Sequence, residues 1–275
     1  MFGLSELKAM TRKPPTDDSA IAADALPALR RGARRSVAPC FLILAGLAIG
    51  LAAAGQLGAW FVVKALIVFA AAMLPMFGAL SAHAPHRSFG AANRIPLLRL
   101  ALIALLAAGI GETPPDAIAA QWTVVAIAAT AALLDAVDGP LARASGLSSP
   151  FGARFDMECD AFLTLVLSVL VLAFDKAGPW IVASGLMRYA FVLASWAWPW
   201  LARPTPPRLW RKTICVVQIS SLIVCLAPIV ATSWSQAIAA ASLLALCGSF
   251  GADVHWLMRR RFEDATNRPL QGQTR

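Results

Sequence analysis

The feature that most constrains this chain is a series of apolar stretches, each long enough to approach the thickness of a lipid bilayer. A helix needs about 20 mostly apolar residues to cross the hydrocarbon core, because each residue advances the helix by about 1.5 Å. Eight stretches approach that length: 38–55, 59–80, 95–111, 119–137, 157–174, 179–198, 212–231 and 236–257. Their lengths predict helices and not barrel strands, so the expected fold class is all-α and polytopic in a membrane.

The amino-acid composition supports a membrane protein. Hydrophobic residues make up 59% of the chain and charged residues only 14%, whereas soluble domains contain about 45–50% and about 25%. The net charge of +9 would by itself allow a nucleic-acid partner. The basic residues lie in the short segments between apolar stretches, however, which is where membrane topology places them. No nucleic-acid partner is therefore expected.

Lysine and arginine residues gather on one side of the predicted membrane. That side holds Arg30, Arg31, Arg34, Arg35, Arg87, Arg94, Arg143, Arg154, Arg203, Arg208, Arg211, Lys212, Arg259, Arg260 and Arg261. The opposite loops have Lys176 as their only Lys or Arg, and the loop 111–116 is acidic. The positive-inside rule then predicts that both chain termini are cytoplasmic. Lys64, near the outer end of its stretch, is expected to extend its side chain to the membrane interface.

Acidic residues are rare inside membranes, so their positions are informative. Five of the fifteen Asp and Glu residues lie between 135 and 160. Asp135 and Asp138 are three residues apart at the end of one predicted helix, and Asp156 and Asp160 are four apart at the start of the next. Each pair projects from one helical face. Because a short cytoplasmic link joins the two helices, we expect the four carboxylates to converge just inside the inner interface.

Four converging carboxylates repel one another unless cations offset their charge. All-oxygen ligation favours Mg²⁺ or Mn²⁺ over zinc. Gly139 and Gly152 lack side chains and are expected to let a helix end open towards a ligand, and Arg143 offers a planar donor fork for phosphate oxygens. Salt bridges alone are a poor alternative, since Arg143 and Arg154 are too few to balance the acids. These residues together predict phosphoryl-transfer chemistry, with two metal ions as the usual arrangement.

The spacing of these residues resembles the signature of the CDP-alcohol phosphatidyltransferase family. All eight specified positions are present: Asp135, Asp138, Gly139, Ala142, Arg143, Gly152, Asp156 and Asp160. The resemblance extends over six predicted spans, from about residue 93 to 258. The segment from Asn93 to Arg99 is similar to the family's Asn-x-x-Thr-x-x-Arg start of the first helix, with Pro96 in place of the Thr.

The resemblance implies a Mg²⁺- or Mn²⁺-dependent enzyme, usually a homodimer, that releases CMP. It assigns metal binding to Asp135, Asp138, Asp156 and Asp160, and gives Asp160 the further role of base for the acceptor hydroxyl. It places four residues along the CDP site: Gly139, Ala142, Arg143 and Gly152. The chain then divides into a basic cytoplasmic tail (1–36), two additional transmembrane helices with a loop (37–90), a six-helix catalytic membrane domain (91–258) and a cytoplasmic C-terminal tail (259–275).

The signature leaves the substrates open. The prokaryote-like length and Ala-rich composition favour CDP-diacylglycerol as donor, in the cytoplasmic (inner) membrane with the active site at the cytoplasmic face. A CDP-choline- or CDP-ethanolamine-type enzyme acting on diacylglycerol is the alternative within the fold. A cation-coupled transporter is an alternative from another class, but its acids would line a path at the membrane midplane. Here the acids gather at one face.

Three further cations suggest the nature of the acceptor. Arg188 lies within the stretch 179–198, and Arg211 and Lys212 stand at the start of the next stretch. An unpaired Arg in hydrocarbon costs several kcal/mol, so an anionic partner is expected. The metal site already accounts for the donor diphosphate, so these cations predict an acceptor alcohol that itself carries a phosphate. Asp253 is the alternative partner for one of them.

Overall fold

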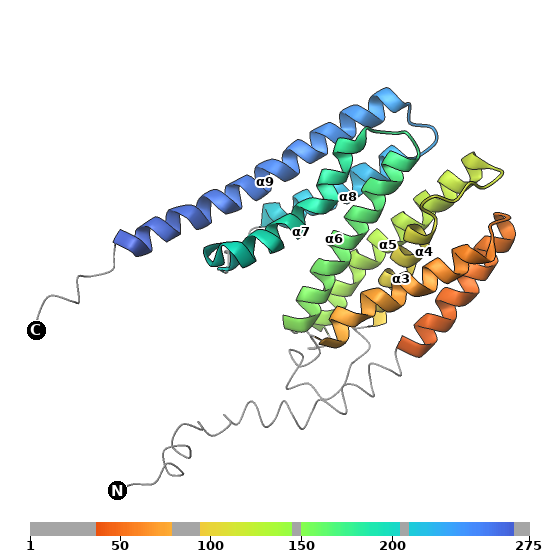
Figure 1. The fold of residues 1–275 in the computed structure, drawn as a ribbon, viewed down its shortest axis with the longest axis horizontal. Coiled ribbons are helices and arrows are strands. Elements are labelled where there is room, and N and C mark those ends of the chain that lie inside the picture. Colours follow the sequence, from red (N-terminus) through yellow and green to blue (C-terminus); the bar gives the residue numbers. More distant parts are fainter. Residues whose placement is uncertain (1–36, 79–93, 145–149, 204–208, 267–275) are drawn as a thin grey trace, which may run out of the picture.

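The described part of the chain is entirely helical (Figure 1). The structure, a computed structural model, describes residues 37–78, 94–144, 150–203 and 209–266. These ranges contain no strand and eight α-helices: Val37–Ala54, α3 (Ala59–Gly78), α4 (Arg94–Ala108), α5 (Ala117–Ala144), α6 (Pro150–Ala173), α7 (Val182–Ala197), α8 (Leu209–Leu226) and α9 (Thr232–Thr266). Each of the eight predicted stretches falls on one of these helices. The all-α fold class is therefore confirmed.

The helices have the length and surface expected in a bilayer. Four segments of the described residues are long and apolar enough to cross a membrane: Val37–Ala54, Ala117–Ala136, Pro179–Ala197 and Thr232–Arg261. Ala59–Leu74 and Ile95–Ala108 are shorter apolar helices. Large apolar side chains such as Leu42, Leu133 and Leu244 lie exposed on the outside of the bundle. Lipid tails, not water, suit such a surface, so the chain is a membrane protein.

Helix α4 lies inside the bundle. Every residue from Arg99 to Leu106 is buried, and the helix packs against α3, α5 and α6. The helix Val37–Ala54 and α3 lie along one side of the bundle, and α7 and α9 lie along the other (Figure 1). The rings of Phe41 and Phe69 join the two N-terminal helices, with centroids 6.1 Å apart. The chain thus surrounds α4 with helices that come both before and after it in the sequence.

Small residues set the closest helix contacts. At Gly185 of α7, an added Cβ would lie 2.9 Å from the Cβ of Leu165 on α6 and closer still to its Cα. No residue with a side chain fits there without moving a helix. In lipid, such close approach replaces the hydrophobic effect as a source of helix association. Gly185 therefore fixes how α7 lies on α6, the helix that carries Asp156 and Asp160.

Helix α5 is longer than the sequence predicted. It continues through Gly139 and Pro140 to Ala144, and α6 already begins at Pro150, so Gly139 and Gly152 lie inside helices. The expectation that these glycines let a helix end open was wrong for the backbone. A proline removes one hydrogen bond from a helix and its ring crowds the carbonyl four residues earlier, but a helix can continue past it with a kink. At 28 residues, α5 is about 42 Å long and exceeds the hydrocarbon core of about 30 Å.

The turns 55–58, 109–116, 174–178 and 227–231 gather at one end of the bundle, which we call the turn end (Figure 1). There, Lys64 forms an ion pair with Glu112 and donates a 3.3 Å hydrogen bond to the Ile110 carbonyl. Lys176 is buried, and its Nζ donates to the carbonyl oxygens of Ala227 (3.1 Å) and Val230 (2.8 Å), just after α8 ends. The expectation that Lys64 only extends to the interface was incomplete, because a carboxylate within the chain meets it.

Candidate active site

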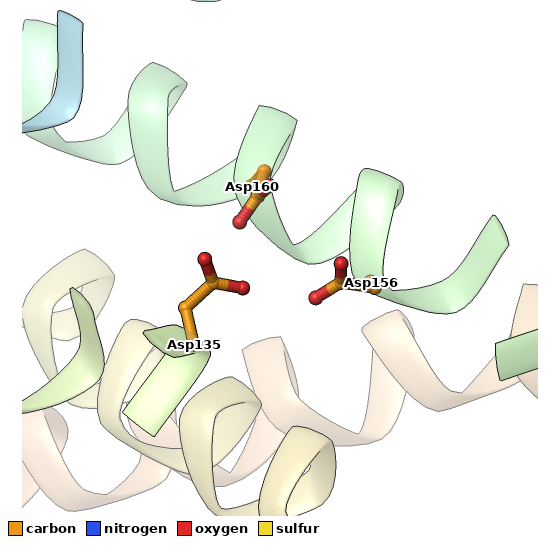
Figure 2. A group of neighbouring side chains, drawn as sticks. All are labelled: Asp135, Asp156 and Asp160. Carbon is orange, nitrogen blue, oxygen red and sulfur yellow. The ribbon is translucent and has the colours of Figure 1, made fainter. Parts of the chain in front are cut away.

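Three aspartates meet between α5 and α6, and we call them the aspartate cluster: Asp135, Asp156 and Asp160. Figure 2 shows Asp135 reaching from α5 towards the two aspartates of α6. One carboxylate oxygen from each residue lies within 4.8 Å of the other two. The side chains are 18%, 39% and 23% exposed, respectively. The cluster is thus partly buried but still accessible.

Helical spacing and packing both contribute to the cluster. Asp156 and Asp160 are one turn apart, so they project from the same face of α6. Asp135 belongs to α5, and α4 packs against both α5 and α6. The sequence predicted this convergence for four aspartates. The structure brings three of them together, while the side chain of Asp138 lies outside its described part.

A buried arginine completes the cluster. Arg99 of α4 is fully buried, and its Nη1 lies 2.8 Å from Asp135 Oδ1 and 2.6 Å from Asp156 Oδ1. Its Nη2 lies 2.5 Å from Asp160 Oδ1. One guanidinium therefore contacts all three carboxylates. Arg99 was not predicted to belong to the site, although a single charged residue inside the apolar stretch 95–111 was a signal that could have suggested such a role.

The cluster carries more negative charge than Arg99 neutralises. Among the described side chains of the cluster, three carboxylates against one guanidinium leave an excess of two negative charges. Two unit charges 4.8 Å apart repel by roughly 3 kcal/mol at an effective dielectric constant of about 20. A hard divalent cation relieves this repulsion, and a set of carboxylate oxygens is the ligand type that Mg²⁺ and Mn²⁺ prefer. The residues present therefore fit such a cation.

Helix α8 forms a further wall of the site. Its Cys215 places Sγ 4.0 Å from Asp160 Oδ2, and α8 packs against both α5 and α6. Arg211 precedes Cys215 by one helical turn, which places it on the same side of α8. The beginning of α8 thus lies beside the aspartate cluster.

The remaining predicted donor-site residues belong to the adjoining ends of α5 and α6. Gly139, Ala142 and Arg143 fall in the last two turns of α5, and Gly152 falls in the first turn of α6. Their backbones are helical, but their side-chain surroundings lie outside the described part of the structure. Their assignment to the CDP site remains a prediction.

The proposed acceptor cations have partners within the chain. Arg188 forms an ion pair with Glu158 of α6, and Arg211 Nε lies 3.0 Å from Asp253 Oδ2 of α9. An unpaired cation in hydrocarbon was the reason to expect an external anion, and this premise does not hold for either arginine. Lys212 is exposed and has no ion pair among the described residues.

Comparison with known proteins identifies the family. A family model described as CDP-alcohol phosphatidyltransferase matches residues 89–247, which is more than half of the chain. The matched region contains α4 to α8, Arg99 and all three residues of the aspartate cluster. Comparison with curated proteins and with solved structures gives no match. On the strength of the family match, this chain belongs to the CDP-alcohol phosphatidyltransferase family, whose members are membrane enzymes that transfer a substituted phosphate group from a CDP-alcohol in phospholipid synthesis.

Proposed function

We propose that this enzyme transfers the phosphatidyl group of CDP-diacylglycerol to the hydroxyl of an acceptor alcohol and releases CMP. The observation that carries the proposal is the aspartate cluster, whose ligand oxygens lie within 4.8 Å of one another in a chain of this family. An excess of carboxylates inside a membrane bundle is unfavourable unless a cationic substrate or a metal balances it. The CDP-alcohol is anionic, which leaves the metal.

The metal ligands in this proposal are Asp135, Asp156 and Asp160, joined by Asp138 from the end of α5. The family uses divalent metals, and the oxygen ligands favour Mg²⁺ or Mn²⁺, with two ions. When bound, such ions neutralise charge on the diphosphate and on the leaving CMP. Gly139, Ala142, Arg143 and Gly152 would line the cytidine diphosphate.

Asp160 is the proposed base. The acceptor oxygen forms a new bond to the phosphorus that carries the diacylglycerol, while the bond from that phosphorus to the oxygen bridging to CMP breaks. The electron pair of that bond leaves with CMP, and the proton of the acceptor hydroxyl passes to Asp160. Asp160 suits this role because its Oδ2 faces Cys215 on α8, away from the Oδ1 atom that Arg99 contacts. General-base help of this kind contributes typically 10²–10⁴-fold.

The acceptor is still proposed to carry a phosphate. Among the three cations predicted to bind that phosphate, Lys212 now comes before Arg211 and Arg188. Lys212 is exposed at the beginning of α8, beside the cluster, so it is the cation best able to meet an acceptor phosphate. Arg211 and Arg188 would do so only by sharing their guanidinium groups with Asp253 and Glu158. Of the three proposed cations, Lys212 is exposed and has no ion pair among the described residues, whereas Arg211 and Arg188 already contact a carboxylate.

The topology and assembly are also proposed. The positive-inside pattern favours a cytoplasmic location for both termini and for the aspartate cluster, and the proposed membrane is a prokaryotic inner membrane. The family match begins at residue 89, which supports 91–258 as the catalytic domain and 37–90 as two added helices. The tails 1–36 and 259–275 would be cytoplasmic, and the enzyme would act as a homodimer.

One experiment tests the reaction and both substrates. Purified full-length protein is incubated with Mg²⁺ and radiolabelled CDP-diacylglycerol, and CMP release is measured with glycerol phosphate, inositol phosphate, inositol and serine as acceptors. We expect CMP release with a phosphorylated acceptor. A parallel assay with CDP-choline or CDP-ethanolamine and diacylglycerol covers the alternative. Activity only in that second assay would reject CDP-diacylglycerol as the donor.

A further inference from the structure

The contacts of Arg99 are concentrated on the carboxylates that would ligate a metal. Its two terminal nitrogens lie 2.5–2.8 Å from the Oδ1 atoms of Asp135, Asp156 and Asp160, the same three carboxylates that form the candidate metal site. The guanidinium is fully buried, so water does not screen its charge. A cation entering the cluster therefore meets carboxylates that already contact a buried positive charge.

The position of Arg99 suits a residue that assembles the cluster. The arginine comes from α4, while the aspartates come from α5 and α6, so its contacts tie three helices together. The planar fork of a guanidinium can hold several carboxylates in fixed directions, which a lysine cannot do. Without either Arg99 or a metal ion, the repulsion among three carboxylates with oxygens within 4.8 Å would push α5 and α6 apart.

We propose that Arg99 is a positioning residue that holds the carboxylates of the cluster together before a divalent cation binds, and that it competes with that cation for them. The proposal rests on the proposed function in one respect, the use of a divalent metal by these aspartates. Arg99 then has two opposite effects. It stabilises the protein when no cation is bound, and it weakens the affinity for the cation through charge repulsion.

The two effects have a consequence that a purely structural arginine does not share. A neutral residue at position 99 leaves three uncompensated carboxylates, so the protein alone becomes less stable. The same carboxylates then bind a divalent cation more tightly, because no positive charge opposes it. By linkage, the cation stabilises such a variant more than it stabilises the wild type. If Arg99 acted only as a tie between helices, its loss would weaken cation binding instead.

The test measures Mn²⁺ binding directly, without substrate, from the electron paramagnetic resonance signal of free Mn²⁺. Wild-type protein is compared with Arg99→Met and Arg99→Lys, all at full length in detergent. We expect Arg99→Met to bind Mn²⁺ at least about tenfold more tightly than wild type, because the repelling charge is gone. Arg99→Lys should bind Mn²⁺ no more tightly than wild type, because it keeps the charge and loses the fork that positions the carboxylates. Lys64→Met is the matched control, since it removes a paired cation at the turn end, and its Mn²⁺ affinity should equal that of wild type.

Thermal unfolding provides the second readout. Arg99→Met should unfold at a lower temperature than wild type without metal, and Mn²⁺ should raise its unfolding temperature by more than it raises that of wild type. Equal or weaker Mn²⁺ binding by Arg99→Met would overturn the proposal. If Arg99→Met does not fold, Arg99→Lys provides the test. Tenfold tighter Mn²⁺ binding by Arg99→Lys would overturn the proposal, because it would show that the positive charge at position 99 does not weaken Mn²⁺ binding.

The outcomes also separate this proposal from the proposed function. Mn²⁺ binding and unfolding require no CDP-alcohol. Absence of CMP release by a wild-type protein that binds Mn²⁺ would count against the proposed reaction alone. Normal Mg²⁺-dependent CMP release together with unchanged Mn²⁺ affinity in Arg99→Met would overturn the role of Arg99 alone.

Discussion

At the aspartate cluster three carboxylates share one guanidinium, whereas at the turn end Lys64 has Glu112 as its own partner and Lys176 is held by two backbone carbonyls. About 14 Å of helix leads from Arg99 to the end of α4 at Ala108, and Glu112 lies four residues beyond that end. Both regions contain charged residues within an apolar bundle. In the cluster the carboxylates outnumber the described cation that contacts them, whereas Lys64 and Glu112 are paired one to one.

The two regions show two uses of charged residues in a membrane bundle. A charge with a partner of its own contributes to packing and orientation, as Lys64 and Lys176 do. An excess of one sign is unfavourable for folding and is retained where a ligand balances it. Arg188 and Arg211 also have one partner each, Glu158 and Asp253, but they lie near the cluster and are proposed to share their guanidinium groups with an acceptor phosphate. The predictions below test this division.

Removal of divalent metal should have the largest effect. We expect CMP release to vanish in EDTA and to return with Mg²⁺ or Mn²⁺ but not with Ca²⁺. Calcium takes longer bonds to oxygen, about 2.3–2.6 Å against about 2.0–2.1 Å for Mg²⁺, and would misplace the diphosphate. Thermal unfolding in EDTA serves as the control for a folded protein. Full CMP release in EDTA would contradict the proposal that a divalent cation balances the excess negative charge of the cluster.

Neutralising a carboxylate should lower kcat strongly in the aspartate cluster and hardly at all at the turn end. Asp160→Asn should lower kcat by about 10²–10⁴-fold, because the acceptor hydroxyl loses its base. It should leave binding of the CDP donor more intact than Asp138→Ala does, since the other metal ligands remain. Glu112→Gln is the matched control at the turn end and should keep kcat within about twofold. Equal losses in Asp160→Asn and Glu112→Gln would abolish the distinction between the two regions.

The positions of the helices and the convergence of the aspartates could be predicted from the sequence. Apolar length alone located all eight helices, because the bilayer fixes how many residues a span needs. Helical spacing placed Asp156 and Asp160 on one face of α6, and the short link to α5 brought Asp135 to them. These inferences depend on residues close in sequence, where local geometry decides the outcome.

The sequence named one partner of these cations correctly, since Asp253 was the alternative partner and pairs with Arg211. The other partners could not be predicted, for the opposite reason. Arg99 meets Asp156 and Asp160 across 57 and 61 residues, and Arg188 meets Glu158 across 30. Such contacts depend on which helices pack together and how they are rotated, which apolar periodicity does not specify when lipid surrounds the bundle. The continuation of α5 past Gly139 and Pro140 was also missed, because residue propensity favours a helix end there.

The cations beside the cluster should affect the acceptor more than the donor. Lys212→Ala should raise KM for a phosphorylated acceptor by about tenfold, since a hydrogen bond to a charged group contributes about 1.5–3 kcal/mol and this residue is exposed. The KM for the CDP donor should change little, because only acceptor binding is weakened. Arg211→Ala and Arg188→Ala should act in the same direction. A preference of the wild-type enzyme for an uncharged acceptor, or equal changes in both KM values, would contradict this assignment.

The smallest effect on the reaction is expected for Lys176→Met at the turn end, where we expect a change in stability only. The side chain keeps its length, but the carbonyls of Ala227 and Val230 lose a charged donor just after α8 ends. A buried carbonyl left without its partner costs about 1–3 kcal/mol, and a cation near a helix C-terminus contributes a further 0.3–1 kcal/mol or so. We therefore expect an unfolding temperature lower by several degrees in detergent, with Lys176→Arg closer to wild type. At temperatures where the protein is folded, kcat and both KM values should not change. A loss of kcat in folded Lys176→Met would show that charges at the turn end also serve the reaction, and that a balanced charge is no sign of a structural role.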